Sequence, residues 1–323
     1  MSVSDLNIQK NVSLKPYTTF GVGGRAKYFV TVLNSEELVL AIKFAKKNKI
    51  RFHILAGGSN VVFADGLLDI LLIKLELPKI FSSSGKIFGE SENFLRQDGE
   101  RIICEGQVCL MDLINFSIKN GLSGLETLSG IPGTVAGAIV GNAAAYGQTI
   151  SDPLVRVQIF DGKKTHWLKK RECGFSYRHS LLKKKPWFVL RAEFAFNAGD
   201  RKELIKKSKE IIKLRLKKYP EGMMCPGSFF KNILLENIPK KSRHLIPENR
   251  DWYGKVPAWF FLNEVGARGM KRGGVYIPDY HGNLLVNDGT AKFKDIKSLA
   301  DELKTRVKKR FNIVLEEEIK YIE

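Results

Sequence analysis

The stretch Leu128-Ser-Gly-Ile-Pro-Gly-Thr-Val-Ala-Gly-Ala-Ile-Val-Gly-Asn-Ala-Ala-Ala-Tyr-Gly147 holds five glycines and five alanines in twenty residues and has no charged side chain. Small residues at this density let a flat ligand or another backbone approach closely. Tight helix packing would account for Ala136, Gly137 and Ala138, but not for the rigid polar turn at 129–133. The stretch therefore predicts a loop that binds a phosphate-containing cofactor.

Two other glycine-rich segments lie nearer the N-terminus. Leu55-Ala-Gly-Gly-Ser-Asn60 ends a short apolar strand pattern, and its backbone N–H groups can either cradle an anion or form a plain turn. Gly21-Val-Gly-Gly-Arg-Ala26 fits the letters of the dinucleotide fingerprint G-x-G-x-x-G/A. That fingerprint needs a strand before it and a helix opening within it, but here a Pro-containing segment precedes and a β-rich run follows. We therefore expect no dinucleotide site at 21–26.

Outward from these loops, the hydrophobic pattern alternates between strand and helix periods, which indicates a mixed α and β protein. The polar stretch Ser82–Glu100 is predicted to be a linker or a long loop, and Asp161-Gly162 predicts a hairpin turn. The predicted strands are Lys27–Leu33, Phe52–Ala56, Asp69–Leu75, Arg101–Glu105, Val155–Phe160, Lys164–Leu168, Trp187–Phe196 and Ile313–Ile322. The predicted helices are Glu36–Asn48, Leu110–Asn120, Arg201–Lys218, Ala258–Gly266 and Asp295–Phe311.

The chain of 323 residues is long enough for two or three domains and carries a net charge of +19. Residues 1–150 hold 15 basic and 13 acidic side chains, whereas residues 151–323 hold 38 and 21. Such an excess of positive charge is typical of proteins that bind nucleic acid, an acidic membrane surface or a phosphate-rich small molecule. The densest basic segment, Arg201–Lys218, has nine basic and two acidic residues in an amphipathic pattern, so a solvated helix face explains most of it.

Several classes of protein are excluded by simple features. No apolar run approaches the ~20 residues that span a bilayer, and Met1–Lys10 does not have the pattern of a secretory signal. The four cysteines fit neither a disulfide framework nor paired C-x-x-C zinc spacing. We therefore expect reduced thiols in a cytoplasmic protein that has no metal site.

Four motifs in sequence order resemble one family. They are Leu55–Asn60, Thr127–Gly147, Phe175-Ser-Tyr-Arg-His-Ser180 and Pro226-Gly-Ser-Phe-Phe-Lys-Asn232. Together they are similar to the UDP-N-acetylenolpyruvoylglucosamine reductase (MurB) family, over nearly the whole chain. Only 49 residues separate Arg178 from Ser228, so the chain resembles the shorter type of that family, which lacks a tyrosine-bearing loop.

The resemblance implies an α+β and α/β architecture: a two-part FAD-binding region of the vanillyl-alcohol-oxidase/PCMH type and a C-terminal α+β substrate-binding domain. It places the first FAD-binding subdomain at 1–80, completed by a C-terminal strand at 313–323. The second subdomain is expected at 81–218 and the substrate-binding domain at 219–312.

The resemblance also implies the reaction and its participants. NADPH would reduce non-covalent FAD, and a hydride would then pass to the enolpyruvyl group of UDP-N-acetylglucosamine enolpyruvate, giving UDP-N-acetylmuramate for peptidoglycan synthesis. The glycine loops contain no His for covalent flavin attachment. No nucleic acid, membrane insertion or obligate protein partner is implied. Two alternatives stay open: another non-covalent FAD oxidoreductase of the same superfamily, and, much less favoured, a basic nucleic-acid-binding protein.

Matched to the family motifs, Ser228 would be the proton donor, with Arg178 and Glu318 as its catalytic partners. An Arg can pair with the substrate carboxylate and spread the charge that develops on it, and a Glu can share a proton there. The expected FAD contacts are Tyr17, Thr18, Thr19, Ala56, Gly57, Gly58, Ser59, Asn60, Ser129, Gly130, Ile131, Pro132, Gly133, Gly137, Ala138 and Asn142. The expected substrate contacts are Tyr146, Tyr177, Lys218, Lys231, Asn232 and His281.

The chain departs from the family pattern at a few positions. Ala144 stands where a glycine is common, Ile233 where a proline is usual, and Pro278 where a polar residue is usual. About 20 extra residues, roughly Leu234–Val256, precede the predicted Ala258 helix. All but the first of these departures concern the expected substrate domain, and the motifs that contain the three expected catalytic residues are intact.

Overall fold

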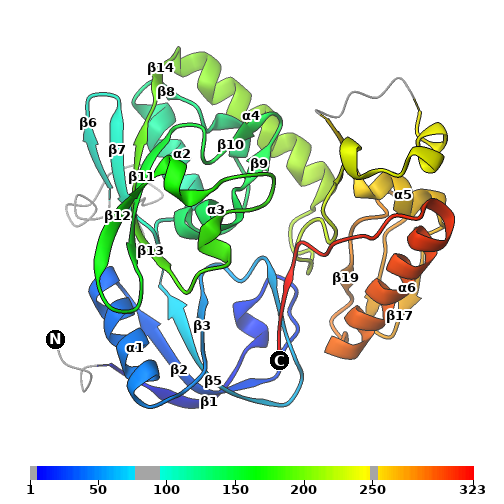
Figure 1. Cartoon of the computed structure of the whole chain (residues 1–323), viewed down its shortest axis with the longest axis horizontal. Coiled ribbons are helices and arrows are strands. Elements are labelled where there is room, and N and C mark those ends of the chain that lie inside the picture. The colour runs from blue at the N-terminus through cyan, green and yellow to red at the C-terminus, as the bar shows by residue number, and fades with distance from the viewer. Residues whose placement is uncertain (1–5, 77–94, 248–253) are drawn as a thin grey trace. The chain divides into compact units, whose positions relative to one another are not determined.

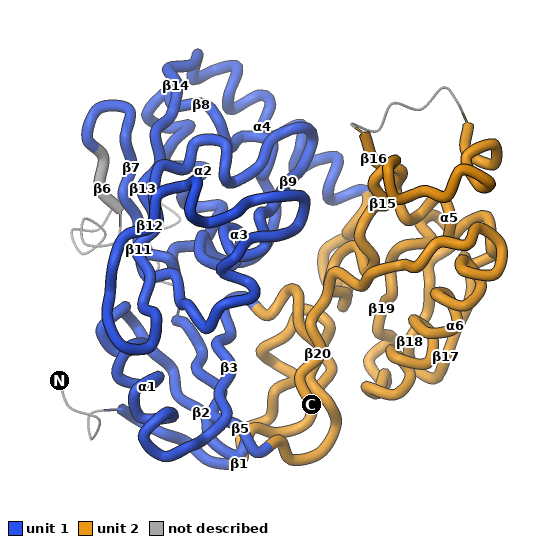
Figure 2. Tube along the Cα trace, in the orientation of Figure 1, with its two compact units in different colours: residues 1–10, 27–57, 69–217 blue, residues 11–26, 58–68, 218–323 orange. Residues whose placement is uncertain are grey.

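A computed structural model describes residues 6–76, 95–247 and 254–323 of the chain (Figure 1). The chain divides into two units, coloured in Figure 2. Unit 1 consists of Met1–Lys10, Lys27–Gly57 and Asp69–Lys217, and unit 2 of Asn11–Ala26, Gly58–Leu68 and Lys218–Glu323. Each unit is therefore assembled from segments that are far apart in sequence.

Most of the first sheet belongs to unit 1. Its strands are hydrogen-bonded in the order β1-β2-β5-β3, and β3 runs parallel to β5. Helix α1 (Ser35–Lys47) begins at Asn34, whose side chain accepts a hydrogen bond from the backbone N of Glu37, and it ends with Lys46 and Lys47 in its last turn. Its apolar stripe packs on the sheet in one hydrophobic cluster. The strands are β1 (Gln9–Ser13), β2 (Arg25–Val32), β3 (Phe52–Leu55) and β5 (Leu67–Leu75).

A five-stranded antiparallel sheet, in the order β12-β11-β13-β7-β6, forms the second layer of unit 1. Its buried face packs against α2, α3 and part of α4 in a single hydrophobic cluster. Phe160 and Leu190 from this sheet also pack in the cluster of the first sheet, which is why both layers belong to one unit. The strands are β6 (Leu95–Asp98), β7 (Arg101–Glu105), β11 (Leu154–Phe160), β12 (Thr165–Lys169) and β13 (Phe188–Ala195).

The remaining elements of unit 1 connect or cover these layers. The helices are α2 (Leu110–Lys119), α3 (Val135–Gly141) and α4 (Arg201–Lys218, of which the last residue belongs to unit 2). The short strands are β8 (Leu122–Ser123), β9 (Ala144–Ala145), β10 (Gln148–Thr149) and β14 (Asn197–Ala198). The pairs β9–β10 and β8–β14 are both antiparallel.

Unit 2 is built around α5 (Ala258–Glu264) and α6 (Phe293–Phe311). A cluster rich in phenylalanine, including Phe229, Phe230, Phe261 and Phe311, forms its core. Its short strands are β4 (Val61–Phe63), β15 (Ile233–Leu234), β16 (Lys255–Val256), β17 (Lys271–Arg272), β18 (Val275–Tyr276), β19 (Val286–Asn287) and β20 (Lys320–Ile322).

The helices and most of the strands predicted from the sequence are present, with ends shifted by no more than two residues, and the hairpin at Asp161-Gly162 is confirmed by the pairing of β11 with β12. Two predictions were wrong in part. The predicted linker contains β6, which pairs with β7, while the rest of it up to residue 94 lies outside the described residues. The predicted closing strand is limited to Lys320–Ile322, because its partner β4 offers only three residues and Glu317 instead pairs with Phe230.

The three-part division of the chain remains a prediction, since the structure separates two units. Among the described residues, no helix is both long and apolar enough to cross a membrane.

Candidate active site

The first pair of predicted flavin loops meets inside unit 1. A Cβ added to Gly57 would lie 3.1 Å from the Cα of Gly133, so the two backbones touch. The 133–136 segment is fixed by backbone hydrogen bonds, from Leu110 N to Gly133 O (3.0 Å) and from Ala136 N to Gly106 O (2.8 Å). The small residues here thus allow two loops to approach each other, as the sequence pattern requires.

The turn at Ser129–Gly130 is fixed by side chains of α4. The buried hydroxyl of Ser129 donates to Glu126 O (2.7 Å) and lies 2.8 Å from the hydroxyl of Ser208. Arg215 Nε donates to Gly130 O at 3.0 Å. The Ser129 hydroxyl is therefore engaged by the protein, and a ligand would meet the backbone of this turn.

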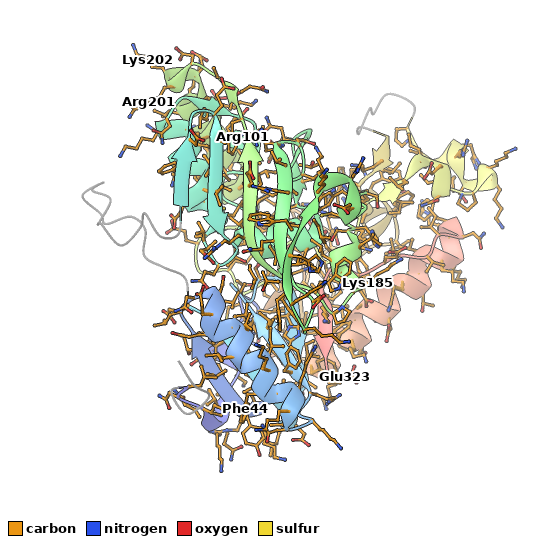
Figure 3. The ribbon with its side chains drawn as sticks, turned by 60° about the vertical axis from the view of Figure 1, so that its left-hand side comes forward. Phe44, Arg101, Lys185, Arg201, Lys202 and Glu323 are labelled. Carbon is orange, nitrogen blue, oxygen red and sulfur yellow. The ribbon has the colours of Figure 1, made fainter. Side chains whose placement is uncertain are left out.

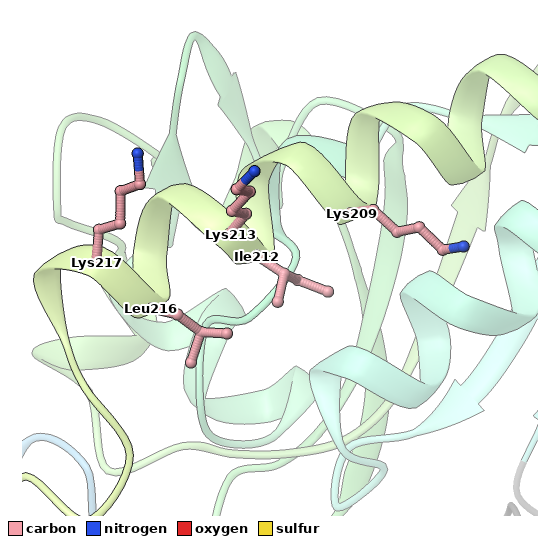
Figure 4. Close-up of a pocket in the computed structure, with 5 residues that line it drawn as sticks. All are labelled: Lys209, Ile212, Lys213, Leu216 and Lys217. Carbon is pink, nitrogen blue, oxygen red and sulfur yellow. The ribbon is translucent and has the colours of Figure 1, made fainter.

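An open cavity of about 480 Å³ lies along the C-terminal half of α4 (Figure 4). Two apolar side chains project from one side of the helix, and lysine side chains extend along it. Ile212 also lies 3.7 Å from where a Cβ on Gly130 would stand, so the cavity adjoins the predicted flavin loop. The lining residues are Lys209, Ile212, Lys213, Leu216 and Lys217.

The second pair of predicted flavin loops meets inside unit 2. Thr19 N donates to Gly58 O at 3.1 Å, and Gly58 adopts a φ of +64°. A Cβ at Gly58 would stand 1.9 Å from Tyr17 O, so only glycine fits. Asn60 Nδ2 donates to Glu318 O at 3.0 Å, which ties this loop to the C-terminal segment.

The residues present fit a polar cofactor such as FAD. Within the described part of the chain, two buried side-chain oxygens in the predicted flavin segments have no hydrogen-bond partner: Thr19 Oγ1 and Asn142 Oδ1. Asn142 is only 5% exposed, and its Nδ2 donates to Ser176 O at 2.9 Å. A buried polar atom without a partner costs ~1–3 kcal/mol, so ligand N–H or O–H groups are the expected partners.

Ser228 lies half-buried in unit 2 between two side chains that immediately precede Pro220. Lys218 Nζ donates to Ser228 Oγ at 3.1 Å, and Tyr219 Oη lies 3.2 Å from the same oxygen. The Ser228 backbone forms an antiparallel bridge with Leu284. The structure thus brings together Ser228 and Lys218, both predicted, and adds Tyr219, which was not predicted.

Glu318 is placed beside the Ser228 segment by backbone pairing. Glu318 N donates to Phe229 O (2.8 Å), Phe230 bridges Glu317, and Lys231 N donates to Glu316 O (2.9 Å). This antiparallel ladder aligns residues 229–231 with 316–318. Of the three adjacent glutamates, Glu318 is therefore opposite the residue that follows Ser228.

Three other predicted substrate contacts also lie in unit 2. Lys231 Nζ pairs with Glu316 at 2.8 Å, and Asn232 Oδ1 accepts a hydrogen bond from the N of Ala258 at the start of α5. His281 Nδ1 accepts from Asn283 N at 3.2 Å. Burial, and then the positive charge of Lys218, lower the pKa of His281 to about 4, so its imidazole is neutral near pH 7.

Arg178 lies in unit 1 on a tight turn in which Ser176 and His179 exchange backbone hydrogen bonds of 3.0 and 3.1 Å. Arg178 has a φ of +54°, a conformation that non-glycine residues seldom adopt and that clusters at functional sites. Ser180 Oγ fixes the turn by donating to Val140 O at 2.7 Å. The Arg178 guanidinium lies 6.0 Å from the ring centroid of Tyr177, another predicted contact.

Tyr146 lies at the two-residue turn between β9 and β10, with a φ of +47°, and half of its surface is exposed. The turn is followed by Gly147, whose φ is +88°. Two positive φ values match a type I′ hairpin turn, where Asn and Gly are usual. A tyrosine with a positive φ is less favourable in this turn than Asn or Gly, and its exposed ring adds little to packing. This arrangement is consistent with the predicted contact between Tyr146 and the substrate.

Sequence reasoning missed Tyr219. It follows a predicted lysine and precedes a proline, and it lies nine residues before Ser228, so no periodic pattern marks it. The only available signal was its position next to Lys218 at the end of a helix.

Comparison with known proteins extends these observations. A model of the FAD binding domain matches residues 26–167, and a model of the C-terminal domain of UDP-N-acetylenolpyruvoylglucosamine reductase matches residues 219–322. A relative from Solibacter usitatus named UDP-N-acetylenolpyruvoylglucosamine reductase is 36% identical over 99% of this chain and 98% of its own. One of the same name from Carboxydothermus hydrogenoformans is 33% identical over 95% and 91%. The solved structure of MurB from Thermus caldophilus has a TM-score of 0.73 at 28% identity, covering 98% of this chain and all of its own.

The fold and the site define an FAD-containing oxidoreductase with a flavin-binding region and a separate C-terminal domain, as predicted. The chain belongs to the UDP-N-acetylenolpyruvoylglucosamine reductase family, and FAD is its cofactor. The predicted family and cofactor are confirmed, and the alternative of a nucleic-acid-binding protein is set aside.

Proposed function

We propose that this chain catalyses the NADPH-dependent reduction of UDP-N-acetylglucosamine enolpyruvate to UDP-N-acetylmuramate, with Ser228 as the proton donor. The observation that carries the proposal is the Ser228 hydroxyl, which receives a hydrogen bond from Lys218 at 3.1 Å in a member of this reductase family. NADPH and the UDP-sugar are its partners, and the cytoplasm, where both are available, is its location.

The chemistry explains why a serine suffices as the acid. Bound FAD would supply the two-electron chemistry, carrying a hydride from NADPH to one carbon of the enolpyruvyl double bond. Hydride addition leaves a carbanion-like centre at the other carbon, and such a centre is basic enough to take a proton from a hydroxyl group. Lys218 stabilises the alkoxide that forms on Ser228, because its ammonium group already donates to that oxygen.

Arg178 and Glu318 serve the other end of the reacting group. The Arg178 guanidinium pairs with the substrate carboxylate and stabilises the charge that spreads onto it during hydride addition. Glu318 holds a proton near the same carboxylate or shares one with it. The strained turn of Arg178 and the pairing of Glu318 with Phe229 support these assignments.

Tyr146, Tyr177, Lys231, Asn232 and His281 are proposed to contact the substrate. The neutral imidazole of His281 has its Nδ1 engaged by Asn283, so it presents an Nε2–H donor, which suits a phosphate or sugar oxygen. Asn232 also caps α5, so its substitution would disturb the fold as well as any contact.

The test separates the two half-reactions with Ser228→Ala. Flavin reduction by NADPH should proceed at the wild-type rate, because it needs no proton from Ser228. Reoxidation of the reduced flavin by the enolpyruvyl substrate should slow by ~10²- to 10⁴-fold, the usual contribution of a general acid. Stopped-flow flavin absorbance measures both rates.

Ser298→Ala on the exposed face of α6 is a matched control and should leave both half-reactions unchanged. A wild-type protein that is reduced by NADPH but is not reoxidised by this substrate would indicate another FAD oxidoreductase. Normal reoxidation in Ser228→Ala would refute the assignment of the proton donor.

A further inference from the structure

Tyr219 is the second polar side chain that contacts the Ser228 hydroxyl, with Oη 3.2 Å from Oγ, which is a long hydrogen bond. Lys218 Nζ lies 3.1 Å from the same oxygen and 5.0 Å from the centre of the Tyr219 ring. All three residues belong to unit 2, so their arrangement is fixed within one unit.

The hydrogen-bonding capacity of these groups determines where the serine proton points. A serine hydroxyl has one proton and two lone pairs, whereas an ammonium group can only donate. Lys218 therefore occupies one lone pair of Ser228 Oγ. If Tyr219 donates to the other lone pair, the O–H of Ser228 must point away from both neighbours, toward a substrate.

We propose that Tyr219 is a positioning residue for proton transfer: its phenol donates to Ser228 Oγ, orients the serine proton, and returns a proton to that oxygen after the substrate has been protonated. The proposal rests on the function proposed above. In the step, the O–H bond of Ser228 breaks as a C–H bond forms on the substrate. The phenol proton then moves to the Ser228 alkoxide. The Tyr219 phenolate takes a proton from a water molecule, and the hydroxide that forms is neutralised in bulk solvent, which supplies the one proton that the reaction consumes.

The acidities favour this direction of transfer. A phenol has an ordinary pKa of about 10 and is a much stronger acid than an alcohol, so a serine alkoxide takes its proton readily. The ammonium group of Lys218, 5.0 Å from the ring centre, stabilises the phenolate electrostatically. Water reaches the site because Tyr219 is only half-buried.

The surroundings hold Tyr219 in place. Its ring packs on a small cluster of Cys225, Leu284 and Val286, and Leu284 bridges the backbone of Ser228. Tyr280 Oη donates to Lys218 O at 3.2 Å, and this hydrogen bond fixes the backbone of Lys218, the residue before Tyr219. The phenol and the serine hydroxyl are thus held by the same group of residues.

Tyr219→Phe tests the proposal, because it removes one hydroxyl and keeps the packed ring. Tyr276→Phe is the matched control, since Tyr276 packs on the same cluster. In Tyr219→Phe we expect unchanged flavin reduction by NADPH and a ~10²-fold slower reoxidation by the enolpyruvyl substrate, at the low end for loss of one donor to a developing oxyanion because Lys218 still donates to the same oxygen. The solvent deuterium isotope effect on reoxidation should rise above that of wild type, as proton transfer becomes more limiting.

The outcomes are distinct for the two proposals. If wild-type protein does not reduce the enolpyruvyl substrate, the proposed function fails, whatever the variant does. If wild type is active and Tyr219→Phe matches Tyr276→Phe in both rate and isotope effect, the inference about Tyr219 is overturned. Equal slowing of both half-reactions in Tyr219→Phe, with no change in isotope effect, would also overturn it, because that result indicates a structural contribution alone.

Discussion

At the scale of single residues, His281 illustrates how neighbours set a charge state. Its pKa is lowered to about 4 by burial first and by the charge of Lys218 second, with a smaller effect from Arg268. Because the folded pKa lies below the ordinary value near 6.5, the unfolded chain binds the proton more tightly. His281 therefore adds stability above pH 6.5 that is lost as the pH falls toward 4.

We predict that the His281 imidazole does not titrate between pH 5.5 and 8 in the folded protein. Lys218→Met should raise the pKa of His281, and Arg268→Met, as the control, should raise it less. NMR titration of the histidine ring resonances measures both changes. If His281 in the wild-type protein titrates near pH 6.5, then burial and the charge of Lys218 do not lower its pKa.

At the scale of elements, Glu126 joins the turn at Ser129–Gly130, which belongs to a predicted flavin loop, to two other parts of unit 1. Its carboxylate, 5% exposed, accepts hydrogen bonds from Gly124 N (2.8 Å), Gln148 Nε2 (3.0 Å) and Lys207 Nζ (3.0 Å). Burial alone would raise its pKa, but these hydrogen bonds outweigh burial and lower the pKa to about 2. The turn that carries Ser129 is thus linked to the β9–β10 hairpin and to α4.

Glu126→Gln is expected to destabilise the protein at pH 7 by about 3 kcal/mol, the free energy that corresponds to its lowered pKa. Because the pKa of Glu126 is lower in the folded than in the unfolded chain, its carboxylate stabilises the folded state fully above pH 5. This stabilisation is lost as the pH falls toward 2. The difference in urea unfolding free energy between wild type and variant should therefore narrow between pH 6 and pH 3.5.

Asp69→Asn serves as the comparison, since Asp69 is 75% exposed beside Lys27. It should show little difference at either pH, because exposed ion pairs contribute little. If the difference in unfolding free energy between wild type and Glu126→Gln stays constant with pH, the lowered pKa of Glu126 does not contribute to stability as described.

At the scale of the whole molecule, the charge of +19 is concentrated in residues 151–323. Helix α4 carries a large part of it, and Arg201 and Lys202 at its start extend away from the ribbon in Figure 3. Another cavity, of about 760 Å³ in unit 1, is lined by Arg101, Arg156, Lys169, Lys170 and Arg171 with Val155 and Glu193. A field of this sign attracts polyanions such as NADPH and a UDP-sugar.

We expect kcat/KM for both anionic substrates to fall about tenfold between 20 mM and 500 mM salt, while kcat stays nearly constant. The reason is that salt screens the long-range attraction of the substrates to the protein but does not affect the chemical step. Replacing Arg201, Lys202 and Lys206 together by Gln should reduce this salt dependence. The matched control replaces Lys294, Lys308 and Lys309 on α6, which has a smaller basic excess. Salt-independent kcat/KM in wild type would rule out steering.

The sequence by itself determined the local features. Hydrophobic periodicity predicted α1, α2, α4 and α6, because this signal lies within the helices themselves. The two glycine-rich loops, the Phe175–Ser180 motif and the Pro226–Asn232 motif, taken in that order, were together sufficient to recognise the family.

Only the tertiary structure decided which distant residues meet. Gly57 touches Gly133, Glu318 pairs with Phe229, and the closing strand shrinks to three residues, each because a partner segment far along the chain sets the contact. The turn that begins at Pro220 brings Tyr219 next to Ser228, and no local sequence pattern predicts this contact. Hydrogen bonds between remote segments depend on topology, which local sequence signals do not encode.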